Sequence, residues 1–174
     1  MKGGPPGEPA AVEVLMLNRQ RRLRVPLRRL ARRTRFFLEA LGSPELSVAV
    51  VLVSDRRIAQ LNRRFLDRRG PTNVIAFPAG PGAQPGAGGV LGDVVVSVET
   101  AAREARAAGV ALGERLTDLV LHGVLHLHGY DHEAGGPEAQ RMARRARALR
   151  RRLAAVEGAR PRGAAGDREQ GERR

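Results

Sequence analysis

The chain has 174 residues, enough for one domain with a substantial hydrophobic core. It contains no cysteine, which excludes disulfides and thiolate metal sites. Its 31 basic residues outnumber its 18 acidic residues, and the net charge of +13 favours a polyanionic partner, nucleic acid ahead of an anionic membrane surface. Codon bias in a GC-rich genome would explain why nearly all the bases are arginine, but not why bases outnumber acids.

The N-terminal segment, residues 1–10, is rich in glycine and proline and is predicted to be disordered. It has no apolar run after a basic start, so no signal peptide is expected. No later apolar stretch is long enough for a membrane span. The cytoplasm is therefore the expected location.

Strands and helices are predicted to alternate at the start of the domain. Loose alternation over residues 12–17 predicts a strand, and an apolar stripe between Pro26 and Leu41 predicts a helix that ends near Gly42. The nearly continuous apolar run 45–53 predicts a buried central strand. The other face of the first helix carries arginines, which we interpret as solvated: Arg28, Arg29, Arg32, Arg33 and Arg35.

A second helix over residues 56–66 is predicted after Ser54, a favourable N-cap residue. Strands are predicted at 73–77 and 90–98, separated by a Gly/Pro/Ala loop over 80–89, and they form a hairpin-like pair. The side chains of the second helix expected to point inward are Ile58, Leu61 and Phe65.

Helices are predicted to close the chain, over residues 100–108, 113–128 and 137–156. The mixed-charge segment 157–174 is predicted to be a disordered tail. The expected fold is a single α+β domain over residues 11–156, with a small mixed sheet of about four strands packed with about five helices.

All four histidines lie in the C-terminal half, within residues 119–132. His122 and His126 are four residues apart, so on a helix they point the same way and can reach one metal ion. Gly129 can take the left-handed conformation that ends a helix. The chain could then fold back and bring His132 to the same ion.

Three imidazoles on one metal leave a coordination position open, which is typical of a catalytic zinc site, with one Zn²⁺ per chain. The alternative is an amphipathic helix with unrelated histidines. His128 points about 160° away from His126 on a helix and is left out of the site.

Gly123 stands where helical zinc proteases have a glutamate base, which disfavours peptide hydrolysis. Asp131 and Glu133 flank the third histidine and are candidate catalytic bases.

Residues 122–132 match every fixed position of the motif H-G-x-L-H-L-x-G-Y-D-H, and the chain thereby resembles the YbeY family of bacterial rRNA maturation factors. Segments 71–78 (PTNVIAFP) and 91–97 (LGDVVVS) are also similar to family motifs. The resemblance implies a zinc-dependent, single-strand-specific endoribonuclease that acts in 16S rRNA 3′-end maturation and ribosome quality control. It also implies ribosomal RNA or the ribosome as partner, with a ribosomal protein or a GTPase as further candidates.

Two positions depart from the family pattern. Leu66 replaces an arginine that the resemblance assigns to RNA contact, and Ala76 replaces a serine. Arginines of the last predicted helix are further candidates for holding phosphates. Those close enough to Leu66 to substitute for the family arginine are Arg63, Arg64, Arg68 and Arg69.

The sequence does not decide between two nucleophiles for attack on the phosphorus: water activated by a carboxylate, or the 2′-hydroxyl of the RNA. Only 3% of the residues are aromatic, so there is little material for base stacking and weak base preference is expected. The rival function is a non-catalytic, zinc-containing ribosome-assembly factor that docks on rRNA through its basic faces.

Overall fold

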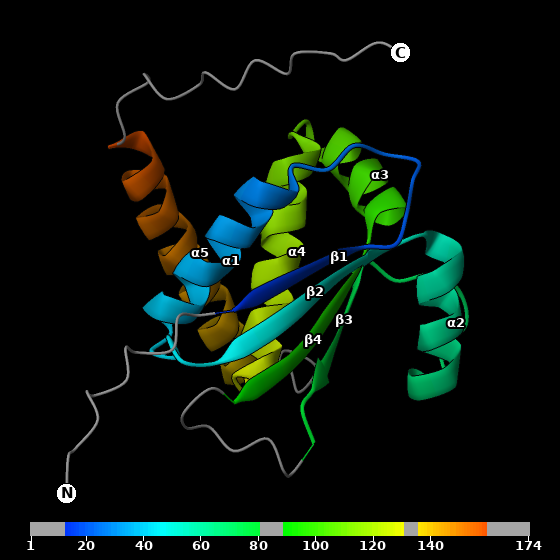
Figure 1. Cartoon of the computed structure of the whole chain (residues 1–174), viewed down its shortest axis with the longest axis horizontal. Coiled ribbons are helices and arrows are strands. Elements are labelled where there is room, and N and C mark those ends of the chain that lie inside the picture. Colours follow the sequence, from blue (N-terminus) through cyan, green and yellow to red (C-terminus); the bar gives the residue numbers. More distant parts are fainter. Residues whose placement is uncertain (1–12, 81–88, 131–135, 160–174) are drawn as a thin grey trace, which may run out of the picture.

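The computed structural model describes residues 13–80, 89–130 and 136–159. Within them, four strands and five helices confirm the predicted α+β class (Figure 1). The predicted N-terminal segment 1–10 lies outside the described residues. In chain order the elements are β1 (Val14–Asn18), α1 (Leu27–Ala40), β2 (Ser47–Val53), α2 (Asp55–Leu66), β3 (Val74–Pro78), β4 (Val90–Ser97), α3 (Val98–Ala108), α4 (Leu112–Leu127) and α5 (Gly136–Gly158).

The four strands form one mixed sheet in the order β1-β2-β4-β3. The strands β1, β2 and β4 are parallel, whereas β3 runs antiparallel to β4 and forms one edge. The hairpin-like pair expected from the sequence is therefore present, with Ile75 opposite Val95. The apolar run of β2 lies between two neighbours, as predicted for a central strand whose two faces are both covered.

Helices cover both faces of the sheet. On one face, α1, α3 and α4 pack against alternate residues of β2 and β4, such as Val50 and Val94. The helix α5 packs outside α1 and α4, where Leu149 joins Phe37 and Leu125. On the other face, α2 packs against the sheet, and the residues buried there are Val53, Ile58, Ile75 and Val95. Figure 1 shows α5 and α2 at opposite sides of the molecule, with the sheet between them.

One expectation about α2 is wrong. Ile58 is fully buried and Leu61 is half-buried, but the Phe65 side chain is 55% exposed. Phe65 lies in the last turn of α2, where its ring meets only the edge of the apolar cluster under this helix. It contacts the Phe77 ring edge-on at a centroid distance of 5.2 Å, and the Arg64 guanidinium lies over it. The aromatic ring is therefore part of the surface.

A second correction concerns Arg33, which is predicted to lie on a solvated face but is only 3% exposed. Its guanidinium donates to both carboxylate oxygens of Glu157 at 2.8 and 2.7 Å, to Glu114 at 2.8 Å and to the Thr117 hydroxyl at 2.8 Å. These bonds compensate the cost of burying the charge. The hydrogen bonds from Arg33 lower the pKa of Glu157 to about 2.

The same network corrects the predicted start of the disordered tail, residues 157–174. Helix α5 continues to Gly158, so Glu157 belongs to the folded domain and ties the end of α5 to α1. The remainder of that segment, from residue 160, lies outside the described residues. Among the helices that the structure describes, none combines the length and apolar character needed to cross a membrane.

Candidate metal centre and cleft

Helix α4 carries one polar stripe between apolar faces. Every fourth residue along it is acidic or histidine, so four such side chains share one line on the helix surface: Glu114, Asp118, His122 and His126. The remaining faces pack into the core, as predicted for Leu116, Leu119, Val120 and Val124, each of which is at most 3% exposed.

The two histidines of this stripe converge. Their Nε2 atoms lie 3.1 Å apart, and the rings meet edge to face with centroids 4.7 Å apart. Two nitrogens bound to one tetrahedral zinc at about 2.0–2.1 Å would be separated by roughly 3.3–3.4 Å. The side chains of His122 and His126 therefore fit a shared metal ion without a change of helix geometry.

Helix α4 ends where the sequence predicts. Gly129 has φ +81°, and its N–H bonds to the His126 carbonyl at 2.9 Å, while the Tyr130 N–H bonds to the Leu125 carbonyl at 3.1 Å. This pair of bonds is a Schellman motif, completed by the packing of Tyr130 into the cluster that contains Leu125. The chain therefore leaves the helix axis immediately after the histidine pair.

The remaining predicted ligand and the two candidate bases follow this turn. His132, Asp131 and Glu133 lie outside the described residues. Within the described part of the chain, no group of three His, Cys, Asp or Glu side chains is placed to hold a metal ion. The three-histidine site thus stays a prediction, for which the structure supplies the converging pair and the turn.

His128 is held away from the pair, in agreement with its exclusion from the site. One ring nitrogen, Nδ1, lies 2.8 Å from the Val124 carbonyl, and Nε2 lies 3.0 Å from the Ser43 hydroxyl. Since a carbonyl only accepts, Nδ1 donates to Val124, and Nε2 shares a hydrogen bond with the Ser43 hydroxyl, which can either donate or accept. Both nitrogens are therefore used in joining the end of α4 to the turn after α1.

Gly123 has a packing role that explains why no glutamate can stand there. A Cβ at this position would lie 2.5 Å from Cγ1 of Val94, on the strand beneath α4. Any side chain at this position would push α4 away from the sheet, and the two histidines of the pair would move with the helix. The protease-type base is thus incompatible with the close approach of α4 to β4.

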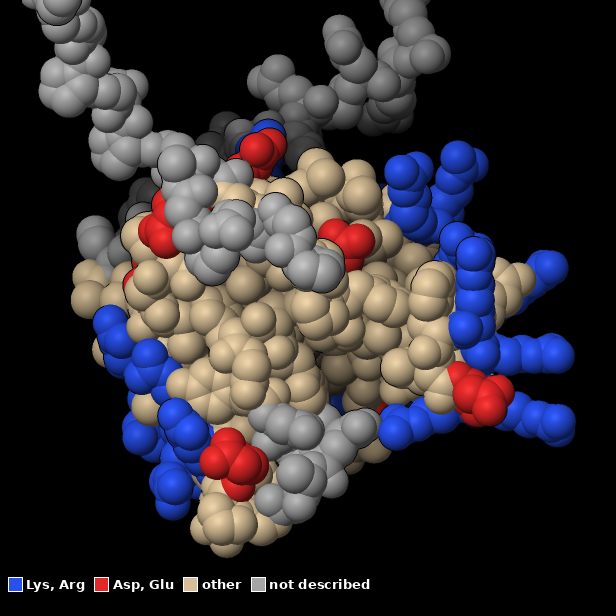
Figure 2. Space-filling view, turned by 90° about the horizontal axis from the view of Figure 1, so that it is seen from below, with Lys and Arg blue, Asp and Glu red and all other residues tan. Residues whose placement is uncertain are grey.

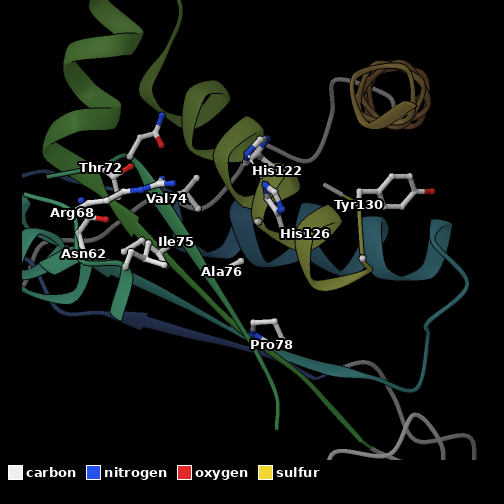
Figure 3. A pocket seen from close by; sticks show the side chains of 14 residues that line it. Asn62, Arg68, Thr72, Val74, Ile75, Ala76, Pro78, His122, His126 and Tyr130 are labelled. Carbon is white, nitrogen blue, oxygen red and sulfur yellow. Dashed lines mark hydrogen bonds between the residues drawn. The ribbon is translucent and has the colours of Figure 1, made fainter. Parts of the chain in front are cut away.

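The histidine pair faces a cleft of about 510 Å³ between α4, β3 and the end of α2 (Figure 3). The strand β3 supplies one wall through Val74, Ile75, Ala76 and Pro78, and the C-terminal end of α4 supplies the facing wall. The β3 side chains that line the cleft are apolar, whereas the α4 wall presents the two histidines, so the polar groups that project into the cleft carry its chemistry.

Of the four arginines predicted to contact RNA, Arg68 lines this cleft. Figure 3 shows its side chain pointing into the cleft from the α2 side, with the histidines on α4 across from it. The backbone explains this placement, because Asp67 adopts φ +50° and ends α2, so the chain turns towards β3. Arg63, Arg64 and Arg69 are exposed and are not among the residues that line the cleft.

Asn62 is a cleft residue that the sequence patterns alone do not single out. It is 4% exposed, and its Nδ2 donates to the Gly70 carbonyl at 3.0 Å, which braces the turn that carries Arg68. Its Oδ1 is buried with no hydrogen-bond partner among the described residues. The available signal is the spacing of four residues between Ile58 and Asn62, which places an amide on the buried side of α2.

Basic side chains gather on two sides of the molecule when it is seen from below the view of Figure 1. Figure 2 shows two groups of Lys and Arg side chains on opposite sides of a largely uncharged central surface. Surfaces that carry one sign of charge attract ligands of the opposite sign, so these basic groups favour an anionic partner.

Comparison with known proteins identifies the family. The family described as Endoribonuclease YbeY matches residues 16–154, and the chain therefore belongs to it. The resemblance inferred from the histidine motif is confirmed. Family membership places the chain among the endoribonucleases, which are nucleases of the hydrolase class.

Individual relatives carry the same name. The Endoribonuclease YbeY of Geobacter sulfurreducens is 44% identical over 143 residues, covering 79% of this chain and 93% of that protein. That of Geobacter metallireducens is 42% identical over 140 residues, with the same shares covered. A solution structure of a Thermotoga maritima protein aligns with a TM-score of 0.56 at 24% identity, covering 92% of this chain and 99% of that one, which supports the fold.

Proposed function

We propose that this protein is a zinc-dependent endoribonuclease that cleaves single-stranded RNA in the cleft between α4, β3 and α2. The observation that carries the proposal is the convergence of the His122 and His126 Nε2 atoms, 3.1 Å apart, in the same cleft that Arg68 lines. The family match supports the RNA substrate.

His122 and His126 would hold the metal, and we propose His132 as the third ligand. When bound, zinc supplies Lewis-acid chemistry to a phosphoryl oxygen or to a water molecule. Asp131 or Glu133 is the proposed general base if water attacks; if the 2′-hydroxyl of the RNA attacks, either carboxylate could take its proton.

Arg68 is the residue that we propose binds the phosphate in place of the family arginine, whose position is occupied by Leu66. A guanidinium presents a planar fork of donors that matches two phosphate oxygens, whereas Leu66 offers only an apolar surface to the same cleft. Asn62 would act through Arg68, because its bond to Gly70 holds the turn on which the arginine lies. Arg63, Arg64 and Arg69 would then add general attraction for RNA rather than a contact at the cleavage point.

We place the activity in 16S rRNA 3′-end maturation and ribosome quality control in the cytoplasm. The proposed partner is ribosomal RNA within the ribosome, with a ribosomal protein or a GTPase as the source of specificity. Among the described residues that line the cleft, Tyr130 is the only Phe, Tyr or Trp, and Figure 3 shows its ring turned away from the histidines. Little base stacking is therefore expected there, which agrees with specificity that comes from a partner.

The decisive experiment measures zinc content by mass spectrometry together with cleavage of single-stranded RNAs, before and after chelation. We expect about one zinc per chain, loss of cleavage on chelation and recovery when zinc is restored. RNAs of different sequence should be cleaved at similar rates by the isolated protein. A folded, zinc-loaded protein without nuclease activity would instead identify a ribosome-assembly factor that only docks on rRNA.

A further inference from the structure

A second cleft of about 580 Å³ lies beside the first, between α4, α5 and the start of β3. Three residues, Asn73, Val74 and His122, line both clefts. The two hollows therefore meet at one member of the histidine pair. A chain molecule bound at the histidines would have this second cleft as a continuation of its path.

The base of the second cleft is electrically compensated. Arg150 donates to Glu114 at 2.7 Å and to Asp118 at 2.9 Å, and Arg115 is paired with Glu104 at 2.8 Å. These arginines are held by carboxylates of the protein itself. They contribute to the fold and leave little uncompensated charge for a ligand.

Two other arginines of the second cleft are in a different situation. Arg147 and Arg151 are exposed and form no ion pair or hydrogen bond with the described residues. They are four residues apart on α5, so they point the same way with roughly 6 Å between them along the helix. The uncompensated positive charge of this cleft therefore lies on the rim formed by α5.

We infer that the second cleft holds the sugar–phosphate backbone of the RNA strand next to the point of cleavage, with Arg147 and Arg151 on successive phosphates. This inference rests on the proposed function, because it requires the histidine pair to mark the cleavage point. The cleft also has an apolar part, formed by the half-buried side chains of Val74 and Ala146, against which ribose can lie. With uncompensated cations on one rim and no Phe, Tyr or Trp among its described lining residues, the cleft suits backbone contact without base readout.

The test compares two double variants of the full-length protein. Arg147→Ala/Arg151→Ala removes the two cleft arginines, and Arg144→Ala/Arg152→Ala removes two exposed arginines of the same helix that do not line either cleft. Both change the net charge equally, and alanine is a good helix former at all four positions. Binding of a short fluorescent single-stranded RNA is followed by anisotropy over a range of salt concentrations in the presence of chelator, with a gel to show that the RNA stays intact.

We expect the cleft variant to bind RNA roughly five- to thirtyfold more weakly than wild type, in line with the removal of two exposed cations from the binding path. Its slope of log affinity against log salt should fall by about 1.4, at about 0.7 per phosphate contact on a single strand. The control variant should stay within about twofold of wild type.

Equal weakening by both double variants would mean general charge attraction and would overturn the inference. So would RNA binding that is unchanged in the cleft variant while binding of a polyglutamate peptide disappears, which would assign the cleft to a protein partner. Chelator-sensitive cleavage by the wild-type protein is scored separately. Failure of the nuclease proposal is thereby distinguished from failure of the second-cleft inference.

Discussion

The two halves of α4 carry polar side chains on the same helical stripe but in opposite circumstances. In the N-terminal half, Glu114 and Asp118 are neutralised by arginines that reach over from α1 and α5. In the C-terminal half, His122 and His126 face a cleft instead of a covering helix. One spacing of four residues thus yields an internal ion network at one end and a candidate metal centre at the other.

This contrast teaches that helix periodicity groups side chains but does not assign their role. The role depends on what lies across from the stripe. Burial raises the pKa of Asp118, and Arg150 opposes that shift, whereas hydrogen bonds from Arg33 and Arg150 outweigh the effect of burial and lower the pKa of Glu114. Two carboxylates one turn apart therefore differ in acidity, because burial dominates at Asp118 whereas hydrogen bonds from two arginines dominate at Glu114.

The largest expected effect comes from the C-terminal half. We predict that His126→Ala lowers kcat/KM for RNA cleavage by at least about a thousandfold, because metal ions stabilise transition-state charge by several kcal/mol. Under the same assay, His128→Ala should keep most of the activity and lose about 1–2 kcal/mol of unfolding free energy, since only its bonds to Ser43 and Val124 are removed. Equal loss of activity in both variants would show that the helix end, rather than the histidine pair, is required.

The next effect comes from the N-terminal half. Arg33→Ala leaves Glu114 and Glu157 without their main cation, and we predict a loss of about 3–5 kcal/mol in unfolding free energy measured by urea denaturation. The neighbouring Arg32 is exposed and serves as the matched control, for which alanine should cost less than about 0.5 kcal/mol. Similar costs for the two substitutions would contradict the buried network.

The smallest effect is a pH dependence of the same network. The pKa of Glu157 is lowered from 4.5 to about 2 in the folded protein, so its contribution is present above the unfolded value and disappears as pH falls from about 4.5 towards 2. We predict a loss of roughly 1–3 kcal/mol over this range, with Asp118 acting weakly in the opposite sense. Urea denaturation at a series of pH values measures it, and Glu157→Gln should flatten the curve. An unchanged pH profile in that variant would exclude Glu157 as the source.

Elements with a strong local signal could be predicted from the sequence. The apolar periodicity of α1 and α4, the Ser54 cap and the glycine at the end of α4 depend on neighbouring residues alone, and each has the expected form. The Ser54 hydroxyl accepts from the Arg57 N–H, and Gly129 has the positive φ that the predicted site requires. The convergence of His122 and His126 follows from the same local geometry.

Features that depend on distant partners could not be predicted. Arg33 is buried because Glu157, 124 positions away, reaches it, and sequence periodicity holds no information on that contact. Phe65 has the spacing of an inward residue, but in the last turn of α2 its side chain is 55% exposed and its ring meets Phe77 edge-on. The choice of Arg68 among four nearby arginines required the left-handed residue Asp67, which is uncommon for a side chain other than glycine.

The edge position of β3 has a consequence for the cleft wall. Among the described residues β3 pairs only with β4, so the outer side of its backbone keeps peptide N–H and C=O groups that are not used in the sheet. These backbone groups can form hydrogen bonds whichever side chains the strand carries. The replacement of the family serine by Ala76 therefore removes one hydroxyl from this wall of the cleft. The backbone of β3 still offers polar groups along the whole strand.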